Sequence, residues 1–209
     1  SFETLYSMDG DVAPVEDFAS LAERTGAMLL IDEAHAVGVC GPEGRGLAAH
    51  LHGCDNVVTL VTCGKALGCE GALILAPTVF RDFLVNRGRS FIFSTAPSPL
   101  IAAIVRESLS IVAGADDRRE RLRQIIEHAH GRLAPLGIPP SGTHIQPVPI
   151  GEDSRTMRIA EALQARSFDI RGIRPPTVPA GTARLRVSLT LNIDEAAVSE
   201  LAIALEDLL

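Results

Sequence analysis

Apolar runs alternate with helical patterns along the first half of the chain. Phe18, Leu21 and Ala22 recur at helical spacing, which predicts a helix over Val15–Thr25. The apolar runs "GAMLLID", "NVVTLVT" and "GALILA" predict strands, and a short helix is expected over Pro77–Asn86. Between the first two strands, "GVCGPEGRGL" has the glycines and proline of a loop. The alternation of helices and strands favours a layered α/β sheet.

The pattern changes near residue 100, where longer helical segments begin. Helices are predicted over Leu100–Ala113, "DDRRERLRQIIEHAHGRLAPLG", Ser154–Gln164 and Asp194–Leu209, and strands over "HIQPVPIG", "FDIRGI" and "ARLRVSLT". Ser154, and either Asn192 or Asp194, are the expected helix caps. The charged run is expected to be a solvated helix face. We therefore predict two domains, residues 1–99 and a small α/β domain over residues 100–209.

Composition narrows the partners of this chain. Its 209 residues are 46% hydrophobic and 22% charged, which is ordinary for a globular protein. A net charge of −7 without a Lys/Arg run argues against nucleic-acid binding. No apolar run reaches the roughly 18 residues of a membrane span, and no signal peptide opens the chain. We expect a cytoplasmic protein that binds neither nucleic acid nor membrane.

The cysteines and histidines do not have the spacing of metal ligands. Cysteines stand at positions 40, 54, 63 and 69, without a CxxC pair. We interpret them as reduced thiols of a cytoplasmic protein. The pairs His50/His52 and His128/His130 are spaced by two, which points their side chains to different sides of a helix. No metal site is predicted.

The stretch "LLIDEAHAVG", Leu29 to Gly38, carries the first chemical signal. An apolar run ends at Asp32 and is followed by an acid, a small residue and His35, as at the end of a buried strand. Two interpretations are open. In DEAH-box ATPases such a strand end holds Mg²⁺ and orients the attacking water. In pyridoxal-phosphate (PLP) enzymes an Asp at a strand end pairs with the pyridine nitrogen.

The stretch "TCGKALG" carries the second signal, a lysine directly after an apolar strand. A lysine on a rigid strand end can be desolvated and its pKa lowered, which suits Schiff-base formation. A nucleotide-binding P-loop would need GxxxxGK followed by Ser or Thr, whereas Ala66 follows Lys65 and Thr59 replaces the first glycine. Asp32 and Lys65 end successive strands and should therefore meet at the carboxyl edge of the sheet, where ligands of α/β proteins bind.

Together "SMDGDVAP", "IDEAHAVGVCGPEGRGL" and "TCGKALGCEGA" resemble the α-oxoamine synthases, PLP enzymes that join an acyl-CoA to a small amino acid with loss of CO₂. The resemblance implies an α/β fold, the PLP-dependent transferase fold type I. The chain would hold the C-terminal part of its large domain and a small C-terminal α/β domain. It also implies the cofactor pyridoxal 5'-phosphate, and a homodimer with shared active sites.

Within that family, "GIRPPTVPAGTARLRVSLT" is most similar to the members that act in biotin synthesis. The implied substrates are glycine and an acyl thioester, pimeloyl-CoA or carrier-bound pimeloyl. The alternatives are a member that makes 2-amino-3-ketobutyrate from acetyl-CoA, another α-oxoamine synthase, and, more distantly, the DEAH-type ATPase.

The resemblance also implies a role for each matching residue. Lys65 would bind PLP as a Schiff base and move protons, Asp32 would pair with the pyridinium nitrogen, and His35 would contact the phenolic oxygen of the ring. The remaining cofactor contacts would come from Thr62 and Ser7, and from Ser94 and Thr95 toward the neighbouring subunit's phosphate. Substrate contacts would come from Arg186, at the glycine carboxylate, and from Arg174 and Thr177 at the acyl-CoA entrance. Pro175 and Pro176 should keep the entrance backbone extended.

Two further parts of the family site are not found in these residues. They are a histidine that stacks on the other face of PLP and a Gly/Ser-rich phosphate loop. Because "SFETLYS" has the pattern of the end of a strand, we expect the chain to begin inside a domain. These 209 residues alone are expected to be inactive.

Overall fold

The computed structural model describes residues 1–209, which form two compact units. The first unit contains Ser1–Tyr6 and Val12–Asp116, and the second contains Ser7–Asp11 and Asp117–Leu209. The predicted α/β class is confirmed, because each unit is a sheet with helices. The domain boundary predicted near residue 100 stays a prediction. None of the helices combines the length and hydropathy that a membrane span requires.

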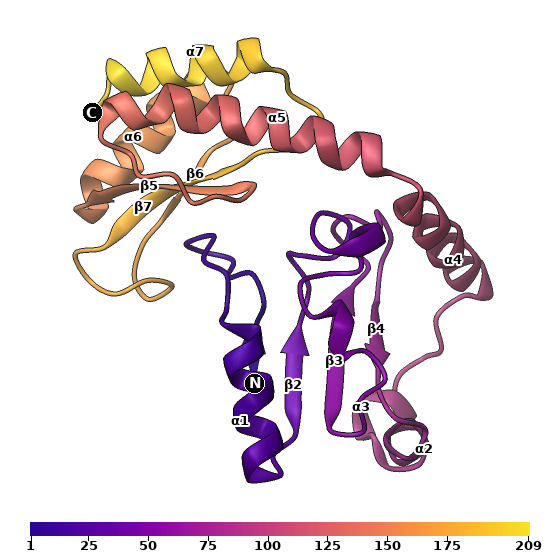
Figure 1. Cartoon of the computed structure of the whole chain (residues 1–209). Coiled ribbons are helices and arrows are strands. Elements are labelled where there is room, and N and C mark those ends of the chain that lie inside the picture. The colour runs from indigo at the N-terminus through magenta and orange to yellow at the C-terminus, as the bar shows by residue number, and fades with distance from the viewer. The chain divides into compact units, whose positions relative to one another are not determined.

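The first unit is built on a four-stranded sheet in the order β1-β2-β3-β4 (Figure 1). Its strands are β1 (Phe2–Glu3), β2 (Leu29–Asp32), β3 (Val57–Thr62) and β4 (Ala72–Leu75). Its helices are α1 (Val15–Thr25), α2 (Thr78–Arg87), α3 (Arg89–Ile92) and α4 (Pro99–Ala113), with short 3₁₀ turns at Pro42–Gly44 and Ala49–Leu51. The first three strands are parallel and β4 is antiparallel to β3. Therefore β2 and β3 end at the same edge.

Two apolar clusters hold these helices against the sheet. Beside α1, Val15 and Phe18 pack with Ile31 and Val57 of the strands. Val105 of α4 belongs to a second cluster that contains Val61, Cys63 and Leu67. Removing such side chains from water stabilises a fold by roughly 1.5–3 kcal/mol each. The second cluster therefore fixes the segment that directly follows β3.

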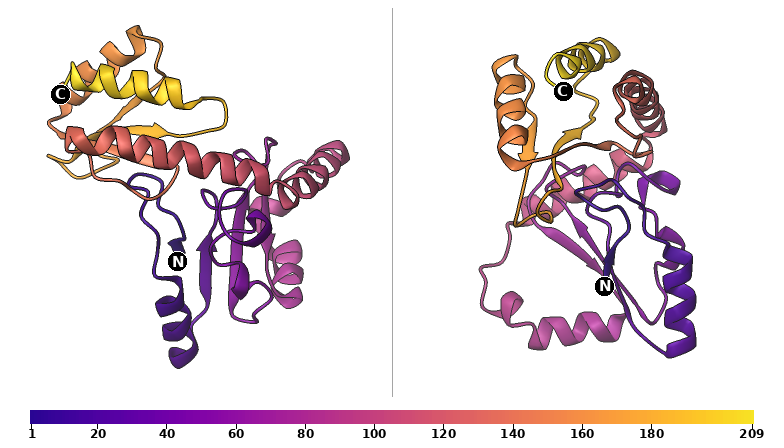
Figure 2. Two further views of the ribbon diagram at one scale, coloured as in Figure 1. Left: turned by 45° about the horizontal axis from the view of Figure 1, so that its top comes forward. Right: turned by 90° about the vertical axis from the view of Figure 1, so that its left-hand side faces the viewer.

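The second unit is a three-stranded antiparallel sheet in the order β5-β7-β6, with helices on one face (Figures 1 and 2). Its strands are β5 (Ile145–Gly151), β6 (Arg171–Ile173) and β7 (Ala183–Ser188). Its helices are α5 (Asp116–Leu133), α6 (Asp153–Ala165) and α7 (Glu195–Glu206), with a 3₁₀ turn at Ala134–Leu136. Leu185 of the central strand and Leu205 of α7 are fully buried, which places the core between sheet and helices.

Most predicted elements are present, and the errors lie at their ends. The strand expected from Gly26 begins only at Leu29, because Gly26 ends α1 in a left-handed conformation. The predicted cap Ser154 is wrong: α6 is capped by Glu152, whose carboxylate accepts hydrogen bonds from the backbone N–H groups of Ser154 and Arg155. Asp194 caps α7 as expected, accepting from the Ala197 N–H at 2.9 Å.

The charged run at the start of α5 is not solvated throughout. Arg119 is buried, whereas its neighbours Arg118 and Glu120 are exposed. On a helix, residues that follow each other point in different directions, so one member of a charged run can face the interior. The strand expected over "FDIRGI" begins only at Arg171, because the residues before it form a turn that the Gln164 side chain fastens to the Ile170 carbonyl at 2.8 Å.

Candidate active site

Lys65 stands at the tip of a tight turn between β3 and β4. Backbone hydrogen bonds from Cys63 N to Gly71 O, 2.9 Å, and from Cys69 N to Cys63 O, 2.8 Å, close the base of the turn. A further bond from Gly68 N to Lys65 O, 3.0 Å, closes its tip. Lys65 itself is exposed, so the expectation that the strand end desolvates this lysine is not met by the chain's own side chains. A ligand or another surface would have to cover it.

The lysine meets the histidine of the neighbouring strand end. The Lys65 Nζ and His35 Nε2 atoms are 2.8 Å apart. A charged ammonium group has donors but no acceptor, so His35 must accept through Nε2 and carry its proton on Nδ1. Asp32, the last residue of β2, accepts a hydrogen bond from the Ala34 N–H at 2.8 Å through Oδ1. The carboxyl edge of β2 and β3 therefore carries an acid, a histidine and a lysine.

Glu33, the acid next to Asp32, has a different position and was missed as a structural residue. Its side chain is completely buried. It accepts hydrogen bonds from Thr4 Oγ1 at 2.5 Å, Leu47 N at 3.2 Å and Ala48 N at 2.6 Å. Because successive residues of a strand point to opposite sides, the acid after Asp32 could have been expected to face inward. Its carboxylate fastens the glycine-rich loop to β1.

Two glycines of the same loop allow close contacts that a side chain would prevent. A Cβ atom on Gly46 would lie 2.5 Å from the Glu33 carboxyl carbon, and one on Gly38 would lie 2.4 Å from the Ala66 Cβ atom. Both glycines also have positive φ angles, which disfavour other residues. Gly38 therefore lets the His35 loop rest directly on the neighbour of Lys65.

Three hydroxyl residues predicted to reach the phosphate lie in the first unit. Thr62 ends β3, and its Oγ1 accepts a hydrogen bond from Gly64 N at 3.4 Å. Ser94 and Thr95 are exposed between α3 and α4, and Ser94 Oγ donates to the Ser90 carbonyl at 2.5 Å. Figure 1 shows α3 at the end of the sheet opposite the β2 and β3 arrowheads. Thr62 thus stands beside the lysine turn, whereas the helix α3 that precedes Ser94 and Thr95 lies at the other end of the sheet. Ser98, the third hydroxyl of that stretch, caps α4.

Ser7 lies in a segment that is fastened to the sheet of the second unit. Asp9 forms an ion pair with Arg184, whose side chain is only 14% exposed. The Gly10 carbonyl accepts a hydrogen bond from Thr143 Oγ1 at 3.3 Å. A side chain on Gly10 would meet the Ile145 carbonyl at 2.3 Å, so glycine is required for this approach. The pairing of Asp9 with Arg184 gives "SMDGD" a structural role that the sequence pattern did not indicate.

Arg186 has the features of an anion-binding residue. Alternation along β7 buries Leu185 and Val187 and leaves Arg184 and Arg186 on the other face, as predicted. The Arg186 Nε atom is shielded from solvent and has no hydrogen-bond partner, and burial lowers the pKa of its guanidinium. An unsatisfied buried donor costs about 1–3 kcal/mol. A bound carboxylate would offset that cost.

Arg174 and Thr177 are exposed at a turn, where an extended backbone was predicted. The Thr177 N–H donates to the Arg174 carbonyl at 3.1 Å, and the Pro175–Pro176 bond between them is cis. The prediction of an extended backbone is therefore wrong, because the hydrogen bond folds the chain back at the two prolines.

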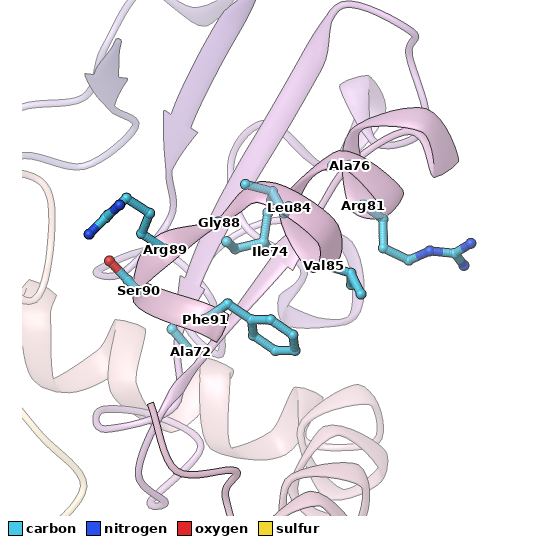
Figure 3. Close-up of a pocket in the computed structure, with 10 residues that line it drawn as sticks. All are labelled: Ala72, Ile74, Ala76, Arg81, Leu84, Val85, Gly88, Arg89, Ser90 and Phe91. Atoms are coloured by element: carbon cyan, nitrogen blue, oxygen red, sulfur yellow. The ribbon is translucent and has the colours of Figure 1, made fainter. Parts of the chain in front are cut away.

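One pocket of the first unit is lined by residues outside the lysine turn. It has a volume of about 440 Å³ and is formed by β4, α2 and α3 (Figure 3). Its lining is Ala72, Ile74, Ala76, Arg81, Leu84, Val85, Gly88, Arg89, Ser90 and Phe91. None of the predicted site residues is among them. We therefore place the candidate site by side-chain geometry at the edge of β2 and β3.

Comparisons with known proteins identify the family of the chain. The model of the family "Aminotransferase class I and II" matches residues 1–205. An 8-amino-7-oxononanoate synthase of Burkholderia thailandensis is 44% identical over 208 residues, which cover 97% of this chain and 53% of that protein. Another 8-amino-7-oxononanoate synthase, from Nitrosospira multiformis, is 39% identical over 209 residues, and the match covers 53% of that protein. The chain spans about half the length of the curated relatives it matches.

Solved structures share the fold. A serine palmitoyltransferase of Sphingomonas wittichii superposes with a TM-score of 0.89 at 26% identity, covering 98% of this chain and 53% of that one. A serine palmitoyltransferase structure described as containing PLP gives 0.89 at 28% identity, with the same coverage. The predicted fold type is therefore confirmed.

Proposed function

Because the chain belongs to the aminotransferase class I and II family, we propose that it carries the part of a pyridoxal 5'-phosphate site that contains the cofactor-binding lysine. The supporting observation is the 2.8 Å contact between Lys65 Nζ and His35 Nε2, at the edge where β2 ends in Asp32. These residue types fit the cofactor, because it needs an amine for its aldehyde and an acid for its ring nitrogen. The shielded, unpartnered Nε of Arg186 fits a substrate carboxylate in the same chemistry.

The proposed reaction is the decarboxylative condensation of glycine with an acyl thioester. A bond forms between the glycine α-carbon and the thioester carbonyl carbon, the thiol leaves, and the glycine carboxylate is lost as CO₂. With a pimeloyl thioester the product is 8-amino-7-oxononanoate. The choice of this acyl group is supported by the names of the relatives at 39–44% identity, from Nitrosospira and Burkholderia.

When bound, pyridoxal phosphate supplies an aldehyde for Lys65 and a protonated ring that delocalises negative charge. Asp32 would hold the proton at the ring nitrogen, and His35 would contact the phenolic oxygen of the ring. Lys65 removes and returns the proton at the glycine α-carbon, which requires the amine to be neutral for part of the cycle. Thr62 and Ser7 bind cofactor oxygens. Each of these roles is a proposal from the matching motif positions.

Residues of the second unit would bind the substrates. Arg186 would bind the glycine carboxylate with its planar, always-charged fork. Arg174 and Thr177, exposed at the cis-proline turn, would contact the acyl thioester. Ser94 and Thr95 would reach the cofactor phosphate of a neighbouring subunit, which implies a homodimer. Both residues are exposed, which leaves them accessible to another subunit. The cytoplasmic location stays a prediction.

Turnover assays with matched donors test the proposal. The purified protein that carries this chain is incubated with glycine and pimeloyl-CoA, and CO₂, free thiol and the amino ketone are measured. Acetyl-CoA with glycine, and palmitoyl-CoA with L-serine, test the other members of the family. We expect glycine-dependent thiol release with the pimeloyl donor and a visible absorbance band that borohydride removes. Nucleotide-dependent ATP hydrolysis without that band would overturn the proposal.

A further inference from the structure

Two cysteines bracket the turn that carries Lys65. Cys63 follows β3 directly, Cys69 precedes β4, and Gly64–Gly68 lie between them. The Cys69 N–H donates a hydrogen bond to the Cys63 carbonyl at 2.8 Å. This bond lies beyond the β3–β4 ladder, whose last pair is Thr62 with Ala72, and it brings the two cysteine backbones into direct contact. A disulfide requires Cα atoms about 4.4–6.8 Å apart, a range that a direct backbone hydrogen bond between two residues allows.

Both side chains point into the same apolar cluster. Cys63 is 1% exposed and belongs to the cluster of Val61, Leu67 and Val105. Cys69 is partly buried and packs against that cluster. The other two cysteines lie on other loops: Cys40 in the glycine-rich loop and Cys54 exposed before β3. The two cysteines at the base of the lysine turn are therefore joined by a backbone hydrogen bond and pack in the same cluster.

We propose that Cys63 and Cys69 form a reversible disulfide with hydrogen peroxide as oxidant, and that this bond couples the oxidation state of the protein to the turn that carries Lys65. The disulfide closes a ring through Gly64–Gly68. It replaces a turn held by hydrogen bonds with one held covalently.

The chemistry assigns different parts to the two thiols. Burial raises the pKa of the Cys63 thiol, and the neighbouring Cys69 raises it further, so Cys63 is the poorer first nucleophile. The less buried Cys69 therefore attacks peroxide: an S–O bond forms, the O–O bond breaks, and hydroxide leaves. The Cys63 sulfur then attacks the Cys69 sulfur, the S–S bond forms, and the S–O bond breaks with loss of water. Two thiols lose two electrons, and one peroxide becomes two waters.

The covalent loop that the disulfide closes should make Lys65 less reactive. The lysine amine must leave His35 to reach an aldehyde, and a turn with fewer conformations allows that movement less often. The proposal of a disulfide does not depend on the proposed function. The proposed effect on Lys65 does depend on it, because it requires that pyridoxal phosphate react with this lysine. The two parts are measured separately.

The disulfide is tested by mass spectrometry of the peroxide-treated protein. Remaining thiols are alkylated, the protein is digested, and the peptides are mapped. We expect a Cys63–Cys69 cross-link that dithiothreitol removes, with Cys40 and Cys54 still alkylated. Cys69→Ser should abolish the cross-link, and Cys54→Ser is the matched control that keeps it. A cross-link to Cys40 or Cys54, or unchanged alkylation of Cys63 and Cys69, would overturn the assignment.

The coupling is tested by trapping pyridoxal phosphate on Lys65 with borohydride at timed intervals. In the oxidised wild type we expect the trapping rate to fall several-fold and to recover with dithiothreitol. Cys69→Ser should trap at the reduced wild-type rate with or without peroxide. Equal rates for oxidised and reduced wild type, or a peroxide effect that persists in Cys69→Ser, would refute the coupling. Unchanged far-ultraviolet circular dichroism of each variant excludes unfolding as the cause.

Discussion

Replacing Glu33 with Gln should destabilise the first unit strongly, although the two side chains have the same shape. The Glu33 carboxylate is completely buried and accepts three hydrogen bonds, from Thr4 Oγ1, Leu47 N and Ala48 N. An amide offers one acceptor oxygen and an NH₂ group. At least one backbone N–H would then face another donor in a place that water does not reach.

The magnitude follows from the contacts. If the Gln oxygen takes the place of Oε2, the contact with Ala48 N at 2.6 Å is lost. A hydrogen bond to a charged group contributes about 1.5–3 kcal/mol, and a buried donor left without a partner costs about 1–3 kcal/mol. In this orientation Thr4 Oγ1 and Leu47 N keep the Gln oxygen as their acceptor, so the loss is confined to the Ala48 contact. We expect a decrease of about 3 kcal/mol in the free energy of unfolding, or about 6–12 °C in melting temperature for a chain of this size.

Thermal and urea unfolding, followed by circular dichroism, measure this change. Glu43→Gln is the matched control, because Glu43 lies in the same loop and pairs with Arg45 on the surface, where both side chains are more than half exposed. Exposed pairs of this kind contribute about 0–1 kcal/mol. A Glu33→Gln protein whose transition coincides with that of Glu43→Gln would refute the argument that the buried carboxylate holds the loop.

Three further predictions concern single side chains. Lys65→Ala should abolish the borohydride-sensitive band while leaving the melting transition unchanged, because Lys65 is exposed; a retained band would remove the lysine from the site. Arg186→Leu should weaken glycine binding, measured by titration, by about 1.5–3 kcal/mol, the contribution of a hydrogen bond to a charged group; unchanged affinity would count against the carboxylate role. Burial lowers the pKa of His130 from its ordinary value of 6.5, so the unfolded chain binds more protons and stability present above pH 6.5 is lost as pH falls through the lowered value. His130→Gln should show a smaller loss of urea resistance on acidification; an identical pH dependence would contradict it.

Elements with strong periodicity could be predicted from the sequence alone. The spacing of Phe18, Leu21 and Ala22 places α1, and the run of β-branched and apolar residues over Val57–Thr62 places β3. Alternation in β7 separates the buried Leu185 from Arg186. These predictions succeed because a local pattern of burial determines them.

The missed features depend on contacts between distant residues or on the details of a helix end. The ion pair of Asp9 with Arg184 joins positions far apart in the chain, and nothing in "SMDGD" indicates it. The cap of α6 was placed two residues late, because serine is among the preferred capping residues and glutamate is not, so the sequence pattern favoured Ser154 over Glu152. The exposure of Lys65 depends on what covers the turn, which an apolar flanking sequence does not reveal.

The two adjacent acids of "DEAH" separate the two interpretations of that stretch on physical grounds. An ATPase needs a residue that orients the attacking water, and a buried side chain with all its acceptors occupied cannot do so. Here Glu33 is the acid after the strand-ending Asp, and it lies in the interior, bonded to Thr4 and to the backbone of the glycine-rich loop. Asp32 stays at the edge, beside a histidine that contacts a lysine. Turning Glu33 outward would break three hydrogen bonds and leave their donors buried, at about 1–3 kcal/mol each. Glu33 therefore cannot activate water in this fold without releasing the glycine-rich loop that it holds.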